Sequence, residues 1–124
     1  MPTEPAPVTL AQLARRAAEI VDPGDDDADV AEFEELFEDA DEPARSLLEE
    51  PLDERVTETV RRIDPEGDRP QIAMAGAIVR YLAHKTAEVD DGRDTILRLA
   101  ARAEYHGDPP PQVADWLVDQ GVAV

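Results

Sequence analysis

The chain has 124 residues, a length that suits one domain with a substantial core, and it carries 30 acidic against 12 basic side chains for a formal net charge of −18. It has no cysteine, which excludes disulfides, thiolate metal sites and cysteine nucleophiles. The negative charge opposes direct binding to nucleic-acid phosphates, and the N-terminal sequence MPTEPAPVT has no basic segment followed by an apolar run, so we expect no signal peptide and a cytoplasmic location.

The acidity is concentrated in one segment. Residues 19–58 hold eighteen acidic side chains and two arginines, a net charge of −16, whereas the other 84 residues carry only −2. A salt-rich cytoplasm favours acidic, lysine-poor surfaces that stay soluble through their net charge, and Lys85 is the only lysine. Such adaptation should acidify the whole surface, so it leaves the asymmetry unexplained.

The N-terminal residues predict a tail followed by a capped helix. Residues 1–8 hold three prolines and show no periodicity, so we expect a disordered tail before one all-helical domain at 9–124. Thr9 and Gln12 form a capping-box pattern ahead of a helix that the next turn, Asp22-Pro23-Gly24, ends. The residues that this helix should bury are Leu10, Leu13, Ala14, Ala17 and Val21.

A second helix is expected at 30–40, with the sequence VAEFEELFEDA and Asp29 as its N-cap. Its acidic side chains stand three and four positions apart, so they repel one another. This unfavourable arrangement indicates that the acidity serves something other than stability. The apolar stripe of the helix consists of Val30, Phe33, Phe37 and Ala40.

The middle of the chain predicts the most buried helix, at 71–84. Eleven of the thirteen residues in QIAMAGAIVRYLA are apolar or glycine, a run typical of a buried helix and too short to span a bilayer. Gly76 should lie where another helix crosses closely, because an interior glycine costs about 1 kcal/mol relative to alanine. Upstream, Pro43 and Pro51 each suit a first helical position, and the sequence leaves open whether 43–63 forms two helices or one helix kinked at Pro51.

Two further helices complete the expected fold. The first of these helices should end just before Gly107, because glycine is favourable immediately beyond a helix C-terminus. The second, QVADWLVDQ, should bury Val113, Trp116 and Leu117. No segment alternates with the period of two typical of strands. The sequence therefore predicts an all-α protein of six or seven short helices packed around the buried helix at 71–84.

The chain also matches itself at an offset of 42 residues. Val21-Asp22-Pro23 aligns with Ile63-Asp64-Pro65, and apolar positions on both sides of these turns align as well. A fainter third copy places Asp108-Pro109 at the same point. The unit would be a helix, an Asp-Pro turn and a helix, as in stacked helical-pair repeats. The alternative is coincidence, since amphipathic helices joined by Asp-Pro turns align once a shift is chosen freely.

No catalytic, metal or cofactor site is predicted. The acidic loop after Asp22 does not place glycine and glutamate where an EF-hand calcium loop needs them. His84 and His106 could pair with Glu88 and Asp108 as acid–base groups or metal ligands, but a histidine in a last helical turn also interacts favourably with the helix dipole. The sequence has no phosphate loop, metalloprotease motif or glycine elbow around its one serine. We therefore expect no enzymatic activity and no cofactor.

Three functions of different classes fit this pattern. An interaction or regulatory module would dock a basic partner protein through residues 25–58, with electrostatic complementarity raising the association rate. A DNA mimic would array carboxylates at phosphate spacing, which one helix supplies only in part. A salt-adapted helical protein would use its charge for solvation alone.

We favour the interaction module. We expect no membrane partner and no direct nucleic-acid partner, and the sequence leaves the oligomeric state open. The basic pairs Arg15-Arg16 and Arg61-Arg62 should then pair with the acidic segment inside the chain. The residues expected to bind the partner are Asp27, Asp29, Glu32, Glu34, Glu35, Glu38, Asp39 and Asp41.

Overall fold

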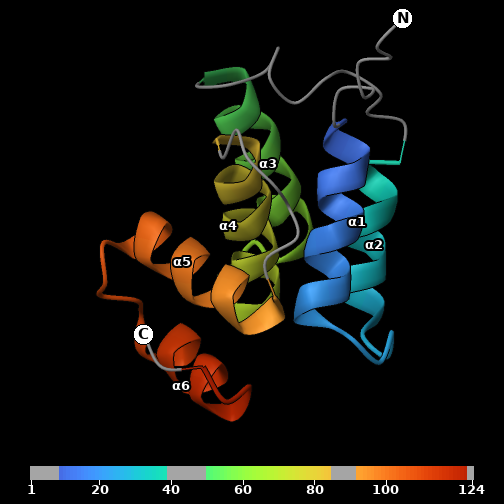
Figure 1. Ribbon diagram of the computed structural model, residues 1–124. Coiled ribbons are helices and arrows are strands. Elements are labelled where there is room, and N and C mark those ends of the chain that lie inside the picture. The colour runs from blue at the N-terminus through green and yellow to red at the C-terminus, as the bar shows by residue number, and fades with distance from the viewer. Residues whose placement is uncertain (1–8, 39–49, 85–91, 123–124) are drawn as a thin grey trace, which may run out of the picture.

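The computed structural model describes residues 9–38, 50–84 and 92–122, which form six helices packed together (Figure 1). The prediction of an all-α fold is confirmed, because these described residues contain helices and no β-strand. The predicted tail at 1–8 and the short helix expected after Pro43 lie outside the described residues. None of the described helices is long and apolar enough to cross a membrane. The helices are α1 (Leu10–Val21), α2 (Ala28–Leu36), α3 (Glu50–Ile63), α4 (Pro70–His84), α5 (Arg93–Tyr105) and α6 (Pro111–Asp119).

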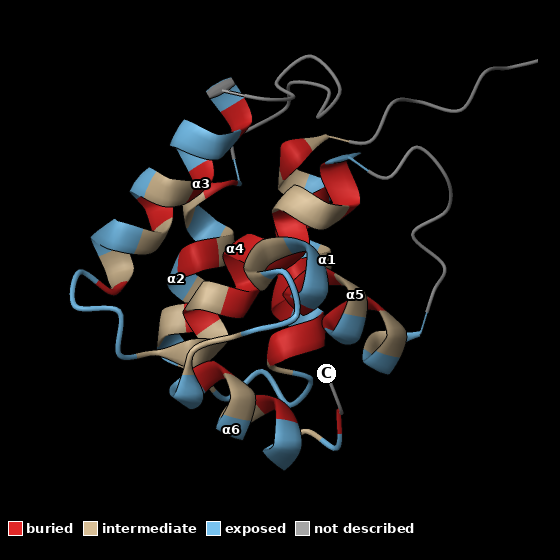
Figure 2. Ribbon diagram, turned by 90° about the vertical axis from the view of Figure 1, so that its left-hand side faces the viewer, coloured by how far each residue is buried: buried red, intermediate tan, exposed pale blue. Residues whose placement is uncertain are grey.

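Helix α4 is the centre of the molecule, as the sequence predicts. It packs against each of the other five helices, and the buried residues gather on it and on the faces turned toward it (Figure 2). A helix that is apolar on nearly every side satisfies this environment because it has neighbours all round. Its buried residues are Ile72, Met74, Ala75, Gly76, Ala77, Ile78, Val79, Leu82 and Ala83.

The close crossing predicted at Gly76 is confirmed, and the helix that crosses there is α3. A Cβ atom built on Gly76 would lie 2.9 Å from Val60 Cγ2 and 3.1 Å from Val56 Cγ1. These distances are shorter than ordinary van der Waals contact, so the absence of a side chain lets the two helices approach. The loss of helix propensity at this glycine is offset by packing.

The first two helices begin with side-chain caps. Thr9 Oγ1 accepts a hydrogen bond from the backbone N–H of Gln12, and Gln12 Oε1 accepts one from the N–H of Thr9, so the predicted capping box is confirmed. The N-cap of α2 is Asp27, and the prediction of Asp29 was wrong. Asp27 Oδ1 accepts from the backbone N–H groups of Asp29 and Val30 at 2.9 and 3.4 Å, so the helix begins at Ala28.

Helix α2 is also shorter than predicted, because its C-terminal end tightens after Leu36. The N–H of Phe37 bonds to Glu34 O three residues back, rather than continuing the α-helical pattern. The Arg55 side chain on α3 donates to Leu36 O at 3.0 Å and lies over the Phe37 ring, 5.2 Å from its centroid. This arginine therefore satisfies a terminal carbonyl of α2 that has no partner in its own helix. Ala40, expected in the same apolar stripe, lies outside the described residues.

The turn between α1 and α2 is held by the carboxylate of Asp22. Its Oδ1 accepts from Asp26 N at 3.1 Å and its Oδ2 from Asp27 N at 2.8 Å. The N–H of Asp25 bonds to the carbonyl of Asp22, and Asp25 has a positive φ of 54°. Aspartate tolerates this left-handed conformation better than most residues. One side chain thus fixes where α1 ends and where α2 can begin.

The turn between α3 and α4 has the same hydrogen bonds 42 residues later. Asp64 Oδ1 accepts from Asp68 N at 3.0 Å and Asp64 Oδ2 from Arg69 N at 2.9 Å. The N–H of Gly67 bonds to the carbonyl of Asp64, and Gly67 has a φ of 73°. The two turns therefore share one geometry, while descent of the two segments from a repeat stays a prediction.

The C-terminal helices α5 and α6 complete the cover of α4. Their turn does not repeat the Asp22 geometry: α5 ends at His106 in the left-handed conformation, followed by Gly107 with a φ of 85°, and the N–H of Asp108 bonds to the carbonyl of Tyr105. Trp116 is only partly buried, so the prediction that it is buried was wrong. The residues that turn inward from α6 are Val113 and Leu117.

Candidate functional site

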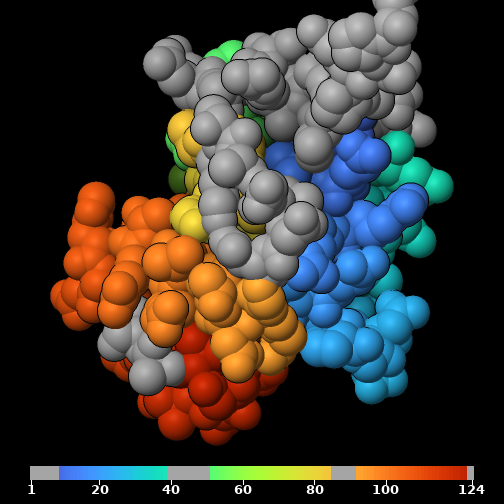
Figure 3. Space-filling view, viewed as in Figure 1, coloured from blue at the N-terminus to red at the C-terminus, as the bar shows by residue number. Residues whose placement is uncertain are grey.

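The described acidic residues are concentrated in the first hairpin, which comprises α1, its turn and α2 (residues 9–38). This hairpin carries ten acidic side chains and two arginines, a net charge of −8. The second hairpin, α3 with α4 (residues 50–84), carries seven acidic side chains and five arginines, a net charge of −2. Residues 92–122 hold five acidic side chains and three arginines, again a net charge of −2. The first hairpin forms one edge of the molecule, drawn in blue to cyan in Figure 3.

Two of the predicted partner-binding residues, Asp27 and Asp29, bond to residues of the second hairpin. Gln71 Nε2 donates to Asp27 Oδ2 at 2.8 Å, and an Arg69 nitrogen lies 3.4 Å from both Asp27 oxygens. The other terminal nitrogen of Arg69 lies 2.9 Å from Asp29 Oδ2. The carboxylates of the α1–α2 turn are therefore tied to the start of α4.

The pKa of Asp27 reflects these bonds. Burial acts to raise the pKa of this carboxyl, but the hydrogen bonds from Gln71, Asp29 N and Val30 N and the positive charge of Arg69 act together in the opposite direction. Their sum outweighs burial, so the pKa of Asp27 lies below its ordinary value of 3.8. The charged form is the one that the fold stabilises.

A third predicted residue, Glu34, faces α1. Its carboxylate lies 3.7 Å from Arg15 Nε, and both side chains are well exposed, so the pair contributes little to stability. Arg16 lies 3.6 Å from Glu19 in the same helix. The expected pairing of the first basic pair with nearby acidic residues is thus confirmed. Arg61 and Arg62 are exposed, and no ion pair links either of them to another residue in the described part of the chain.

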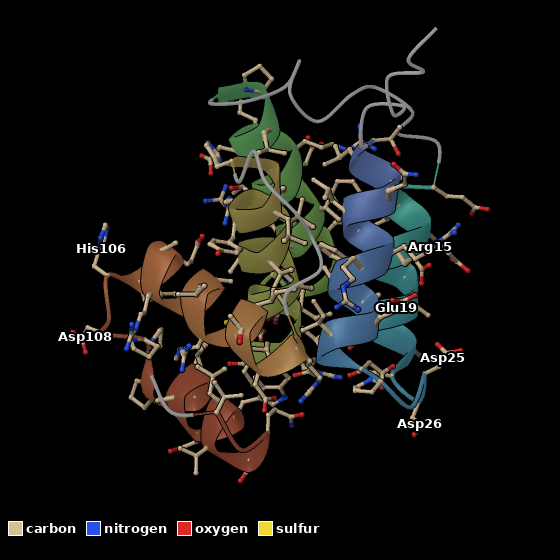
Figure 4. The ribbon with its side chains drawn as sticks, in the orientation of Figure 1. Arg15, Glu19, Asp25, Asp26, His106 and Asp108 are labelled. Atoms are coloured by element: carbon tan, nitrogen blue, oxygen red, sulfur yellow. The ribbon has the colours of Figure 1, made fainter. Side chains whose placement is uncertain are left out.

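The remaining described candidates are exposed acidic residues at the C-terminal half of α2. Glu32 and Glu35 are three residues apart on the same side of the helix, and Glu38 follows in the turn just beyond the C-cap residue Phe37; all three are exposed. No described basic side chain forms an ion pair with any of them. We call these three residues the acidic face. At the turn, Asp25 and Asp26 point away from the protein (Figure 4). The candidates Asp39 and Asp41 lie outside the described residues.

Sequence reasoning missed the residues that engage the acidic turn from the second hairpin. Arg69 lies in a loop of mixed charge, and Gln71 follows just after that loop. The residues next to them in the sequence do not indicate that either side chain would bind the acidic turn. The one available signal was the offset of 42 residues, which places Arg69 opposite Asp27 and Gln71 opposite Asp29. Opposite charges or hydrogen-bonding groups at equivalent positions of two hairpins can meet if the hairpins face each other.

A groove of about 310 Å³ lies between α4 and α5. Arg80 crosses it, with one nitrogen 2.9 Å from Glu104 and another donating to Thr57 Oγ1 at 2.6 Å. Arg80 Nε lies 2.9 Å from Asp53 Oδ1 without hydrogen-bond geometry, so that contact is an ion pair only. The groove is lined by Ala77, Arg80, Tyr81, His84, Ala103 and Glu104.

The charged groups of this groove are engaged with one another, which leaves no arrangement of an acid beside a nucleophile. Burial raises the pKa of Tyr105 next to it, the negative charge of Glu104 adds to that effect, and the positive charge of Arg80 opposes it. His84 Nδ1 lies 2.8 Å from the carbonyl of Arg80 within its own helix. Arg80 on α4 therefore links α3 and α5 across the groove.

Of the two histidine pairs considered from the sequence, the structure describes both members only of His106 and Asp108. No hydrogen bond or ion pair joins His106 to Asp108, and the two exposed side chains point in different directions (Figure 4). Glu88, the possible partner of His84, lies outside the described residues. Within the described ranges, no group of three histidine, aspartate or glutamate side chains could hold a metal ion.

Comparison with known proteins gives no relative for this chain. No protein-family model matches it, and no curated protein or solved structure matches it significantly.

Proposed function

We propose that the protein is a small helical interaction module whose acidic face, Glu32, Glu35 and Glu38, docks a basic surface of a partner protein. The observation that carries this proposal is a division within one acidic segment. Asp27, Asp29 and Glu34 each meet a basic side chain of the same molecule, whereas the acidic face meets none among the described residues.

The exposed carboxylates contribute nothing favourable that we can identify to their own fold. Glu32 and Glu35 are like-charged neighbours three residues apart within α2, and such a pair opposes the helix by a few tenths of a kcal/mol. Glu38 adds a further negative charge just beyond the C-terminal end of α2, the negative end of the helix dipole. A negative face can instead raise the rate at which a basic partner is found and reject acidic surfaces. Partner binding therefore accounts for a feature that stability does not.

The arrangement favours a protein partner over mimicry of DNA. Mimicry needs parallel rows of negative charge that follow both phosphate backbones, and the described residues supply one row, on α2. The neighbouring helix α3 presents exposed arginines at Arg55, Arg61 and Arg62, which interrupt a second row. Solvation in a saline cytoplasm is the competing account, because exposed acidic residues also occur on α3 and α6.

The test is capture of a partner from the organism's own extract by the immobilised full chain. Wild-type protein should retain a basic protein at 0.05 M salt and release it at 1 M, because the Debye length falls from above 10 Å to about 3 Å. The triple variant Glu32→Gln, Glu35→Gln and Glu38→Gln should retain much less of it.

A matched variant separates a specific face from total charge. Asp108→Asn, Asp115→Asn and Asp119→Asn also remove three exposed charges, but from the α5–α6 turn and from α6. This control should capture the partner as wild type does. Equal loss in both triple variants, or no salt-dependent capture by wild type, would support solvation and overturn the docking proposal.

A further inference from the structure

The two hairpins contact each other reciprocally. Asp27 in the first turn bonds to Gln71, and Arg69 in the second turn pairs with Asp29. At the offset of 42 residues, Asp27 corresponds to Arg69 and Asp29 corresponds to Gln71. The contact of Asp27 with Gln71 is therefore equivalent to the contact of Arg69 with Asp29, with the two hairpins exchanged. The contact between Asp27 and Arg69 is its own counterpart. Such reciprocity is typical of two units related by an approximate twofold rotation, as at an isologous interface.

A rotation that relates the two turns would also place α2 and α4 in equivalent positions, although their outer faces differ. Ala77 and Arg80 on α4 line the groove against Ala103 and Glu104 of α5. At the same offset, the counterparts of Ala77 and Arg80 are Glu35 and Glu38 of the acidic face, and the counterpart of the buried Met74 is Glu32. The acidic face thus corresponds in position to the surface of α4 against which α5 packs. Helices α5 and α2 lie on opposite sides of the molecule, as this relation requires (Figure 1).

From this equivalence we propose that the acidic face binds a basic amphipathic helix of the partner, laid on α2 as α5 is laid on α4. The inference rests on the proposed function and adds the shape of the recognised element. On α4, the interaction with the docked helix includes the ion pair between Arg80 and Glu104 at 2.9 Å. In the first hairpin the equivalent residue is Glu38, just beyond the C-terminal end of α2, so the sign is reversed and the partner helix supplies arginine or lysine.

The partner residues are set by the spacing on α2. Glu32, Glu35 and Glu38 follow one another at intervals of three, so complementary basic side chains should recur every three or four residues along one side of the partner helix. Leu36 is half-buried beside the acidic face, at the edge of a small groove with Arg55 and Thr59 of α3, and offers limited apolar contact. The interaction is therefore expected to be mainly electrostatic, and weak at high salt.

The test uses two synthetic peptides of equal charge with the full-length protein. The first is an amphipathic peptide of about 20 residues, long enough to form a helix in water, with lysine or arginine every three or four positions. The second has the same basic residues but two prolines in its centre, which prevent a continuous helix. Binding is measured by fluorescence anisotropy at 0.05 M salt, and the site is located from backbone NMR shifts of α2.

The helical peptide should bind at least about tenfold more tightly than the proline peptide and should shift the amides of α2. Neutralising the acidic face should weaken binding of the helical peptide by about tenfold, because the exposed ion pairs between the three glutamates and the peptide are lost. The control triple variant at Asp108, Asp115 and Asp119 should bind this peptide as wild type does. Equal affinity for both peptides, lost with the acidic face, would overturn the helix inference and leave the docking proposal intact. Failure of both peptides to bind α2 would overturn both.

Discussion

At the scale of single residues, Asp27 has the largest set of bonds among the described acidic residues of the first hairpin. It caps α2 through two backbone N–H groups and meets Gln71 and Arg69 of the second hairpin. A carboxylate can accept several hydrogen bonds at once, which an uncharged side chain of similar size cannot do as strongly. One aspartate therefore fixes both the start of a helix and the approach of two hairpins.

The pH dependence of stability should reveal this role. The folded-state pKa of Asp27 lies below 3.8, so its charge stabilises the fold fully above the unfolded pKa, and that contribution is lost as pH falls through the folded pKa. Asp27→Asn keeps an N-cap and removes the charge. We expect wild type to be the more stable protein at pH 6 and the difference to shrink below about pH 4. Urea unfolding of both proteins across this range measures it, and a difference independent of pH would contradict the assignment.

At the scale of elements, the crossing of α3 over α4 depends on the missing side chain of Gly76. The γ-carbons of Val56 and Val60 occupy the space where a Cβ would lie. Valine side chains within a helix have one strongly preferred rotamer, so they cannot easily turn away. The crossing distance of the two helices is therefore limited by these three residues.

Replacing Gly76 with alanine should destabilise the protein by about 1 kcal/mol. Overpacking costs about 1–3 kcal/mol, and the better helix propensity of alanine returns about 1 kcal/mol. In a Val60→Ala background the nearest contact disappears, so the same change should be neutral or stabilising. Denaturant unfolding of the four proteins completes a double-mutant cycle. A stabilising Gly76→Ala in wild type would show that α3 does not limit the site.

At the scale of the whole molecule, negative charge is distributed unevenly over a fold that is nearly balanced elsewhere. The first hairpin carries −8, and the other two described ranges carry −2 each. Repulsion within a charged element opposes the compact state, and dissolved ions screen it. The free energy of unfolding should therefore rise with salt, and the first hairpin should contribute most to that rise.

Neutralising the acidic face should stabilise the isolated protein at low salt. The sequence alone suggested Glu34, Glu35 and Glu38 for this test, but Glu34 lies beside Arg15, so Glu32 takes its place. The variant Glu32→Gln, Glu35→Gln and Glu38→Gln removes one like-charge neighbour pair within α2 and a negative charge just beyond its C-terminal end, for an expected gain of about 0.5–1 kcal/mol that disappears at 1 M salt. Urea unfolding at both salt concentrations measures it. A loss of stability would mean that these carboxylates are structural, which removes the motive for the docking proposal.

The sequence by itself determined the all-α fold, the capping box at Thr9, the burial of α4 and the close crossing at Gly76. These features follow from local rules, since periodicity, caps and glycine cost act within a few residues along the chain. Tertiary structure decided which charges face inward. In the sequence, Asp27 and Asp29 resemble the other acidic residues of the segment. Only the tertiary structure brings Arg69 and Gln71, some forty residues away, into contact with them. Tertiary structure also left Trp116 partly exposed, because an apolar stripe predicts which side of a helix is buried but not how far the neighbouring helices cover it.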